Sequence, residues 1–213
     1  MARPRKSKHS SSHAGGTRIR VVARAGLPTR FGRFTVLGVE GSGRQETAVV
    51  LQHGRVGNGS VPLVRVHSQC LTGDVLTSQR CDCRAQLELS LRRIARAKSG
   101  LLLYLPQEGR GIGLMNKLRA YELQDRGMDT VEANHRLGFP SDSRNYLFSA
   151  WALRKLGVRR VRLLSNNPDK VRQLEEGGIR VVQRVPCQPK TSRVTRRYLR
   201  TKKSKLGHLL AGL

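Results

Sequence analysis

The stretch between residues 101 and 126 decides the fold class, because it joins a strand, a loop and a helix in one short run. It begins with the apolar segment Leu101-Leu-Leu-Tyr-Leu105, which is typical of a short, buried strand. The glycine-rich loop Gln107-Glu-Gly-Arg-Gly-Ile-Gly113 follows, and Leu118 and Tyr121 then share one face of a predicted helix. A buried strand that leads through a loop into a helix is the repeating unit of α/β proteins.

The same alternation continues on both sides of this stretch. Towards the C-terminus we predict a polar loop over 129–142, helices over 147–156 and 168–177, and strands over 160–164 and 179–185. Towards the N-terminus we predict a helix over 85–98 and four β-rich runs over 18–25, 31–40, 47–52 and 61–67. The sequence therefore predicts a mixed α/β fold, in which a β-rich N-terminal part is followed by alternating strands and helices with a partly parallel sheet.

The charge of the chain is strongly positive and unevenly distributed. The 213 residues carry a formal net charge of +27, and every Asp and Glu lies between Glu40 and Glu176. We expect residues 1–16 to be a disordered basic tail, residues 17–190 one folded domain, and residues 191–213 a basic C-terminal extension. Basic ends attract polyanions without specificity, which is typical of nucleic-acid binding and equally of a field that draws in a small polyphosphate.

Two further features bear on where the protein works. No stretch approaches the roughly 20 apolar residues of a membrane span, and the basic N-terminus lacks the apolar segment of a secretory signal. We therefore expect no membrane association and a cytoplasmic location. In that compartment, clustered cysteines are more often metal ligands than disulfides.

Three of the four cysteines, Cys70, Cys81 and Cys83, lie in one polar stretch with the spacing C-x10-C-x-C. Three thiolates so spaced can bind one soft divalent metal, with zinc the best match, and leave a position for water. His67 could instead close the site as a fourth ligand, and inert buried thiols are a further alternative. The neighbouring residues favour a metal over inert thiols because they do not resemble a core: Thr72, Asp74, Arg80 and Asp82.

Two polar segments follow predicted strands. In the loop 107–113, glycines allow a close backbone approach and Arg110 could grip a phosphate, although many such loops are only turns. The segment from Ser165 to Lys170 follows the strand 160–164, at the kind of edge where ligands of α/β sheets gather. A plain helix cap would give the same sequence there.

Three single residues are also candidates. Asp142 could accept a proton while Arg144, two residues later, holds or attacks a phosphate, although Asp142 could equally be a helix cap. Tyr121 lies on a helix face, where it could belong to the core. Its hydroxyl could also exchange a proton beside a metal-bound water.

Together these motifs closely resemble the GTP cyclohydrolase II family. The resemblance is carried, in chain order, by Val66-His-Ser-Gln-Cys-Leu-Thr-Gly-Asp74, Arg80-Cys-Asp-Cys83, Gln107-Glu-Gly-Arg-Gly-Ile-Gly-Leu114, Asp129-Thr-Val-Glu-Ala-Asn-His135 and Leu163-Leu-Ser-Asn-Asn-Pro168. It runs from about Leu27-Pro-Thr-Arg-Phe-Gly32 to Lys205-Leu-Gly-His208 and leaves out residues 1–16. It implies the monofunctional form, with residues 17–190 as the catalytic domain and part of 191–213 inside the match.

The resemblance implies the first step of riboflavin biosynthesis. The family hydrolyses GTP to 2,5-diamino-6-(5-phosphoribosylamino)pyrimidin-4(3H)-one, formate and pyrophosphate. The match places one Zn2+ on Cys70, Cys81 and Cys83, where an activated water would attack C8 of guanine, and Mg2+ with the triphosphate. It also implies a homodimer.

The resemblance gives roles to further residues. The implied catalytic residues are Tyr121 near C8, Asp142 as general base and Arg144 as the nucleophile at the α-phosphorus, although a guanidinium is chemically an unusual nucleophile. The implied nucleotide-binding residues are Arg65, Val66, His67, Ser68, Gln69, Gln86, Glu108, Gly109, Arg110, Thr130, Ser165 and Lys170.

Two positions depart from the family pattern, and two other functions stay open. Gln69 stands where Glu is common and Ser165 where Thr is common, and both keep hydrogen-bonding capacity. One alternative is a paralogue that stops at the formylated pyrimidine, against which Tyr121 argues. The other is a basic, zinc-containing nucleic-acid-binding protein, which explains the charge but not the loop 107–113 or the segment 165–170.

Overall fold

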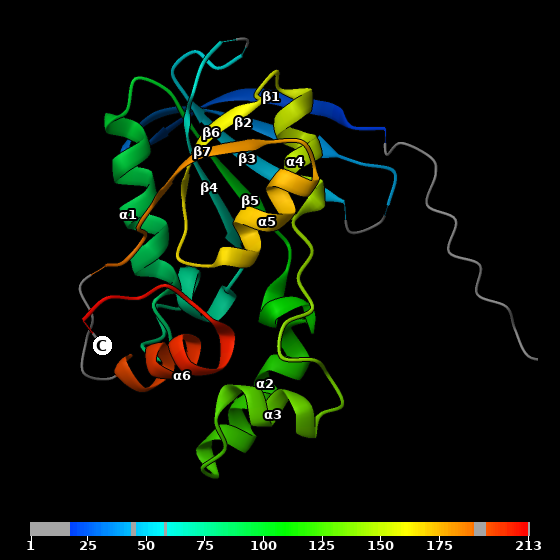
Figure 1. Ribbon diagram of the computed structural model, residues 1–213, viewed down its shortest axis with the longest axis vertical. Helices are drawn as coiled ribbons and strands as arrows, with labels where there is room; N and C mark the ends of the chain where they lie inside the picture. The colour runs from blue at the N-terminus through cyan, green and yellow to red at the C-terminus, as the bar shows by residue number, and fades with distance from the viewer. Residues whose placement is uncertain (1–17, 44–45, 58, 190–194, 213) are drawn as a thin grey trace, which may run out of the picture.

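The computed structural model describes residues 18–43, 46–57, 59–189 and 195–212, and within them a seven-stranded sheet forms the centre (Figure 1). In sheet order the strands are β1 (Arg20–Thr29), β2 (Gly32–Glu40), β3 (Thr47–His53), β5 (Gly100–Leu105), β4 (Leu63–Ser68), β6 (Arg160–Leu164) and β7 (Arg180–Val185). Neighbours from β1 to β5 pair antiparallel, whereas β4 pairs parallel with β5 and β6, and β6 with β7. The predicted α/β fold with a partly parallel sheet is confirmed.

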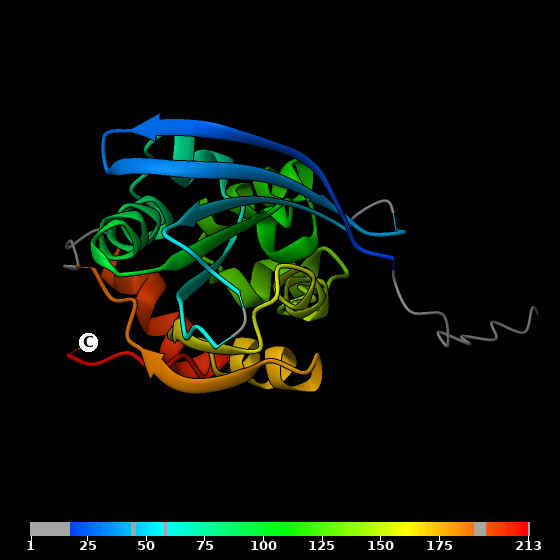
Figure 2. The same ribbon diagram turned by 90° about the horizontal axis from the view of Figure 1, so that it is seen from above.

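Helices cover both faces of this sheet, as the view from above shows (Figure 2). The helices are α1 (Cys83–Arg96), α2 (Leu114–Asp125), α3 (Thr130–Arg136), α4 (Leu147–Lys155), α5 (Pro168–Glu176) and α6 (Arg196–Leu206). Two shorter turns, η1 (Leu71–Val75) and η2 (Glu108–Gly111), follow β4 and β5. In Figure 1, α2, α3 and α6 lie together beyond one end of the sheet.

Two buried clusters hold the layers together, one on each face of the sheet. On the α1 side, Ile94 is buried with Phe34 and Leu102. On the α4 and α5 side, Leu153 and Leu174 belong to a larger cluster that includes strand residues of both parts of the sheet. Because β5 is covered on both faces, its side chains are apolar without alternation, which is why the run 101–105 could be predicted as a buried strand.

The segment 129–142, predicted to be a loop, contains the helix α3. The carboxylate of Asp129 accepts hydrogen bonds from the backbone N–H groups of Val131 and Glu132, and the side chain of Glu132 accepts one from the N–H of Asp129. This reciprocal capping box fixes the start of a helix. The loop prediction was wrong because it followed the polar composition of the segment and overlooked the Asp-x-x-Glu spacing.

The C-terminal segment, predicted to be a basic arm, is a docked helix where it is described. Nζ of Lys202 donates to Asp82 Oδ1 at 2.9 Å, and the two side chains are only 10% and 7% exposed. Lys205 pairs with Asp129 and Glu132 at the start of α3. Two positive charges of α6 therefore balance acidic side chains of the domain, which a composition count could not show.

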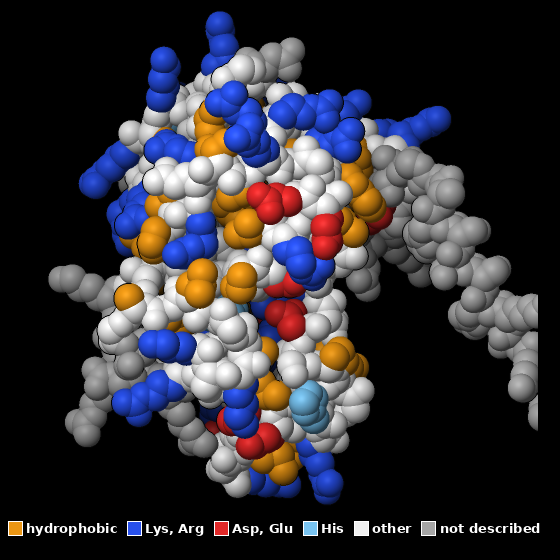
Figure 3. All heavy atoms as spheres, in the orientation of Figure 1, with side chains coloured by type: hydrophobic (Ala, Val, Ile, Leu, Met, Phe, Trp, Pro, Cys, Tyr) orange, Lys and Arg blue, Asp and Glu red, His pale blue; other side chains and the backbone are white. Residues whose placement is uncertain are grey.

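Positive charge is also spread over the surface. On the face shown in Figure 3, Lys and Arg side chains predominate over Asp and Glu around the sheet. The predicted tail, residues 1–16, and the predicted boundary at residue 190 lie outside the described residues, so nonspecific polyanion binding by the tails stays a prediction. None of the described helices has the length and apolar character needed to cross a bilayer.

We expect Lys202→Met to destabilise the fold, because it leaves the Asp82 carboxylate buried without its partner. Burial alone would raise the pKa of Asp82, but Lys202 outweighs it and holds this pKa below its usual value. Removing one partner of a buried ion pair costs about 3–5 kcal/mol in the free energy of unfolding, measurable by urea titration. The double variant Lys202→Met/Asp82→Asn should recover part of the loss. A single variant as stable as the unmodified chain would contradict this role for the pair.

Candidate active site

A cavity lies at the edge of the sheet where β4, β5 and β6 end, and loops from distant parts of the chain form its walls. Ligands of parallel sheets gather at such carboxyl ends of strands. Most residues singled out in the sequence line it: Arg65, His67, Ser68, Gln69, Cys70, Cys81, Cys83, Gln86, Glu108, Gly109, Arg110, Tyr121, Thr130, Arg144, Ser165 and Lys170. Val66 and Asp142 do not line it, and each is hydrogen-bonded to a residue that does.

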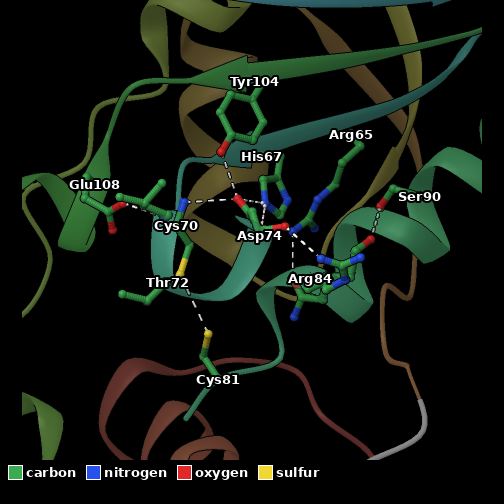
Figure 4. Close-up of polar contacts among 12 residues, drawn as sticks. Arg65, His67, Cys70, Thr72, Asp74, Cys81, Arg84, Ser90, Tyr104 and Glu108 are labelled. Atoms are coloured by element: carbon green, nitrogen blue, oxygen red, sulfur yellow. Dashed lines mark hydrogen bonds and ion pairs between the residues drawn. The ribbon is translucent and has the colours of Figure 1, made fainter. Parts of the chain in front are cut away.

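The three cysteines converge on one point of this cavity. Their sulfur atoms lie within 4.8 Å of one another, and Sγ of Cys70 is 3.7 Å from Sγ of Cys81 (Figure 4). Gly73 allows this approach, because a Cβ there would lie 2.8 Å from Sγ of Cys81 and 3.1 Å from Sγ of Cys70. Any side chain at position 73 would therefore displace the sulfur cluster.

The chemistry of these donors fits a soft divalent cation. Hydrogen bonds from Cys81 and Cys83 lower the pKa of the Cys70 thiol, and the hydrogen bond with Cys70 raises the pKa of Cys81 to about 11. The cluster therefore stabilises one thiolate by hydrogen bonds from the other two thiols. Ionisation of a second or third thiol needs a cation among the sulfur atoms. His67, the alternative fourth ligand, lies outside the cluster found in the described chain, because its Nε2 faces Asp74 at 3.2 Å.

Asp74 organises the loop that carries Cys70. Its carboxylate accepts hydrogen bonds from the N–H of Cys70 at 3.0 Å, the hydroxyl of Tyr104 at 2.9 Å and Nε2 of His67 at 3.2 Å (Figure 4). Burial lowers the pKa of His67, so its ring is neutral and donates through Nε2. The interpretation of the polar neighbours as residues outside the core was wrong for Thr72, Asp74 and Asp82, whose side chains are buried. A carboxylate that is hydrogen-bonded to the backbone of a metal-binding loop fixes the orientation of the metal-binding side chain, here Cys70.

Glu108 is bound within the protein, whereas the sequence resemblance gave it to the triphosphate. Its carboxylate accepts from the N–H of Leu71 at 2.6 Å, the N–H of Gly109 at 2.9 Å and Nζ of Lys117 at 2.7 Å. Lys117 also donates to Sγ of Cys70 at 3.1 Å. Burial would lower the pKa of Lys117, but Glu108 and the Cys70 sulfur outweigh it and raise this pKa. Lys117, which the sequence analysis missed, is thus an ammonium ion beside a proposed metal ligand.

Tyr121 faces the cavity rather than the core. Its hydroxyl lies 3.0 Å from Oγ1 of Thr72, two residues after Cys70, and Tyr121 lines the cavity. The guanidinium of Arg80 stands 4.8 Å from the centre of the tyrosine ring. Burial raises the pKa of Tyr121, so its hydroxyl keeps its proton at neutral pH and can donate it. Tyr121 therefore belongs to the cavity wall and not to the hydrophobic core.

Arg110 and Arg144 supply positive charge to the same cavity. Both terminal nitrogens of Arg110 are buried and have no hydrogen-bond partner within the described chain. Its φ of 61° is in the left-handed region, which is costly for a residue with a side chain and is typical of functional loops. Arg144 donates through Nε to Oδ1 of Asp142 at 2.8 Å, and its N–H is also bound by that oxygen. Asp142 therefore reaches the cavity only through Arg144.

A third group of residues joins β4, α1 and α5. Arg65 donates to Oε1 of Gln86 at 2.6 Å and to the carbonyl of Leu164 at 3.1 Å. Nζ of Lys170 donates to the carbonyl of Val66 at 2.8 Å, so Val66 takes part through its backbone while its side chain is in the core. These contacts set polar groups of three different elements along one wall.

Comparison with known proteins agrees with the motifs. A family model described as GTP cyclohydrolase II matches residues 19–186, which is most of the chain and includes every cysteine of the sulfur cluster. The chain belongs to the GTP cyclohydrolase II family. It is therefore an enzyme of that family, and the predicted resemblance is confirmed.

Members of the GTP cyclohydrolase II family from several bacteria are similar over nearly their full length. The chain is 55% identical to a GTP cyclohydrolase-2 of Pseudomonas fluorescens (strain SBW25), over 89% of this chain and 92% of that protein. It is 50% identical to a GTP cyclohydrolase-2 of Shewanella oneidensis, over 91% of this chain and 95% of that protein. Among solved structures, a two-domain 3,4-dihydroxy-2-butanone 4-phosphate synthase from A. baumannii shares 20% identity at a TM-score of 0.36, covering 71% of this chain and 35% of that chain, which is too weak to support a conclusion.

Proposed function

We propose that this chain hydrolyses GTP to 2,5-diamino-6-(5-phosphoribosylamino)pyrimidin-4(3H)-one, formate and pyrophosphate, as the first step of riboflavin biosynthesis. The observation that carries the proposal is that two chemically different sets of side chains line one cavity. One set is a thiol cluster with Tyr121, and the other is the guanidinium groups of Arg110 and Arg144. A ring carbon and a triphosphate are the two parts of GTP that need these environments.

Cys70, Cys81 and Cys83 would hold zinc, and bound zinc would supply a Lewis acid that makes water a strong nucleophile near neutral pH. Residues of the chain prepare the ligands for that ion. Asp74 fixes the backbone of Cys70, and Lys117 favours the thiolate form of Cys70 by its positive charge.

Tyr121 would serve the ring-opening end. Its hydroxyl, held near Thr72 and protonated at neutral pH, can give a proton to a nitrogen of the guanine ring as the bonds at C8 break. The buried polar wall of Arg65, Gln86 and Lys170 would face the rest of the nucleoside. Backbone and side-chain contacts within that wall keep it in place before substrate arrives.

Arg110 and Arg144 would serve the phosphate end. The unpartnered nitrogens of Arg110 can bind phosphate oxygens, and Mg2+ would enter with the triphosphate. Because both carboxylate oxygens of Glu108 are engaged, we propose that Glu108 braces the cysteine loop and that Arg110 meets the phosphates.

The role of Arg144 as nucleophile needs a proton acceptor. Burial would lower the pKa of Arg144, but the aromatic and carboxyl groups of Tyr146 and Asp142 outweigh it and raise this pKa. The proton therefore stays on Arg144 until the phosphorus–nitrogen bond forms, and Asp142, hydrogen-bonded to Nε of Arg144, is placed to receive it at that stage. A nitrogen of Arg144 would bond to the α-phosphorus, pyrophosphate would leave, and water would later cleave the phosphorus–nitrogen bond to give the 5′-phosphate.

We expect Tyr121→Phe to slow formate release about 10²–10⁴-fold, because a positioned proton donor contributes that much to such steps. Pyrophosphate release should continue, since Arg144 and Arg110 are unchanged. The measurement is separate quantification of formate, pyrophosphate and formylated pyrimidine during GTP turnover by zinc-supplied protein. Unchanged rate and ratio of formate and pyrophosphate in Tyr121→Phe would refute the assigned role.

The overall proposal is tested by incubating the purified, zinc-supplied chain with GTP and Mg2+ and looking for the diaminopyrimidine product. Protein stripped of metal should be inactive and should recover on addition of zinc. A chain that binds GTP and releases none of the three products under these conditions would contradict the proposal. The homodimer expected for the family stays a prediction, and light scattering of the same preparation tests it.

A further inference from the structure

The turn after α6 brings a histidine into the cavity. α6 ends at Gly207, whose φ of 63° lies in the left-handed region and lets the chain reverse. The N–H of His208 then donates to the carbonyl of Lys202 at 3.1 Å, and the N–H of Leu209 donates to the carbonyl of Asn166 at 2.8 Å. The turn is thus tied both to α6 and to the loop before α5, and His208 lines the cavity.

His208 faces positive charges that come from four different parts of the chain. These are Arg110 of η2, Arg144 of the loop before α4, Lys202 of α6 and Lys170 of α5, although burial lowers the pKa of Lys170 itself well below its usual value. Burial and then these four charges lower the pKa of His208 to about 3, so its ring is neutral at pH 7. Its surroundings therefore repel a further positive charge while the cavity holds no anion.

The cations near His208 are only partly neutralised by the protein. Arg144 is paired with Asp142, and Lys202 with Asp82. Arg110, by contrast, has two buried terminal nitrogens without a partner in the described part of the chain. The planar fork of an uncompensated, buried guanidinium can bind two oxygens of a phosphate group at once.

Tyr198 adds a second side chain of α6 to the same wall. Its ring centre lies 6.0 Å from the guanidinium of Arg110 and 4.4 Å from Nζ of Lys202. Tyr198 thus lies near both cations, and its aromatic ring favours their positions without neutralising them. The wall that α6 contributes is therefore polar and positively charged on its cavity side.

We propose that His208 is a further phosphate-binding residue, and that the turn after α6 completes the phosphate end of the nucleotide cavity. The identity of the nucleotide rests on the proposed function, whereas the affinity for a polyphosphate rests on the cation cluster alone. A bound polyphosphate replaces repulsion by attraction, so His208 takes up a proton from solvent and donates a charged hydrogen bond to a phosphate oxygen.

The test is isothermal titration calorimetry of the zinc-supplied full chain at neutral pH. The probes are magnesium tripolyphosphate, which carries only the phosphate part, and guanosine, which carries none, and zinc content is checked after each titration. His208→Ala should weaken tripolyphosphate binding about ten-fold or more, the size of one charged hydrogen bond, and leave guanosine binding unchanged.

Repeating the titration in buffers of different ionisation enthalpy measures the proton uptake directly. The unmodified chain should take up a proton with tripolyphosphate, and His208→Ala should not. His208→Gln should keep part of the affinity through a neutral hydrogen bond and show no proton uptake. Lys203→Ala, a change at an exposed residue of α6, is the control and should match the unmodified chain in both readouts.

Two results would overturn the inference. Equal weakening of guanosine and tripolyphosphate in His208→Ala would show that the turn only supports the wall. Unchanged tripolyphosphate affinity with unchanged proton uptake would show that His208 does not meet the phosphates. If GTP were not hydrolysed but tripolyphosphate still bound with His208-dependent proton uptake, the proposed function would fail and this inference would stand.

Discussion

Cys81→Ser is expected to abolish both zinc binding and ring opening of GTP. Loss of a residue that only supports a metal ligand lowers metal affinity about 10–100-fold, so loss of a ligand should lower it further. Sγ of Cys81 lies 3.7 Å from Sγ of Cys70, and a serine oxygen is a poor substitute for a soft donor. The unmodified chain should bind about one zinc ion per chain, as a three-sulfur site requires. The measurements are metal content by mass spectrometry and formate release from GTP.

Cys187→Ser is the matched control for this prediction. Cys187 is buried and free, but its backbone N–H is bound to Asn166 and its sulfur lies outside the cluster of three. The control should keep the zinc content and activity of the unmodified chain. Full ring-opening activity in Cys81→Ser protein that holds no zinc would refute the metal assignment.

Arg144→Ala is expected to abolish pyrophosphate release. If Arg144 attacks the α-phosphorus, this variant lacks the attacking nitrogen. Even if it acted only by charge, loss of one preorganised donor would cost about 10²–10³ in rate. Pyrophosphate is measured by a coupled assay in single-turnover conditions, and intact mass spectrometry of the unmodified chain looks for a covalent nucleotide adduct that Arg144→Ala lacks.

Arg172→Ala provides the control for the loss of an arginine. Arg172 is on α5, and its exposed side chain pairs with Asp169 and Glu176. Its replacement should leave pyrophosphate release unchanged. If Arg144→Ala released pyrophosphate as fast as Arg172→Ala, Arg144 would have no chemical role. If Arg144→Ala kept a residual rate and neither it nor the unmodified chain formed an adduct, Arg144 would act by its charge alone.

The elements that the sequence predicted well are those with a strong local signal. The run 101–105 is buried on both faces of the sheet and is therefore apolar throughout, and Asn167 before Pro168 marks the start of α5 with a side-chain cap. The three clustered cysteines could be singled out by their spacing, Arg110 by its glycine-rich loop, and Tyr121 by the family resemblance.

The parts that the sequence did not predict depend on contacts between distant residues. Lys117 is on a helix and would ordinarily be taken as exposed, and only the approach of Glu108 and Cys70 makes it buried. The docking of α6 depends on Asp82, which precedes Lys202 by 120 positions. A positively charged sequence alone cannot distinguish such paired lysines from a solvated arm.

The central claim is that one cavity both opens the guanine ring and removes pyrophosphate. Its most direct test is the simultaneous quantification of formate, pyrophosphate and diaminopyrimidine during turnover of GTP by the zinc-supplied chain with Mg2+. We predict that all three products accumulate in equal amounts and that none forms when zinc is removed. Pyrophosphate without formate, or turnover that persists in metal-free protein, would contradict the claim.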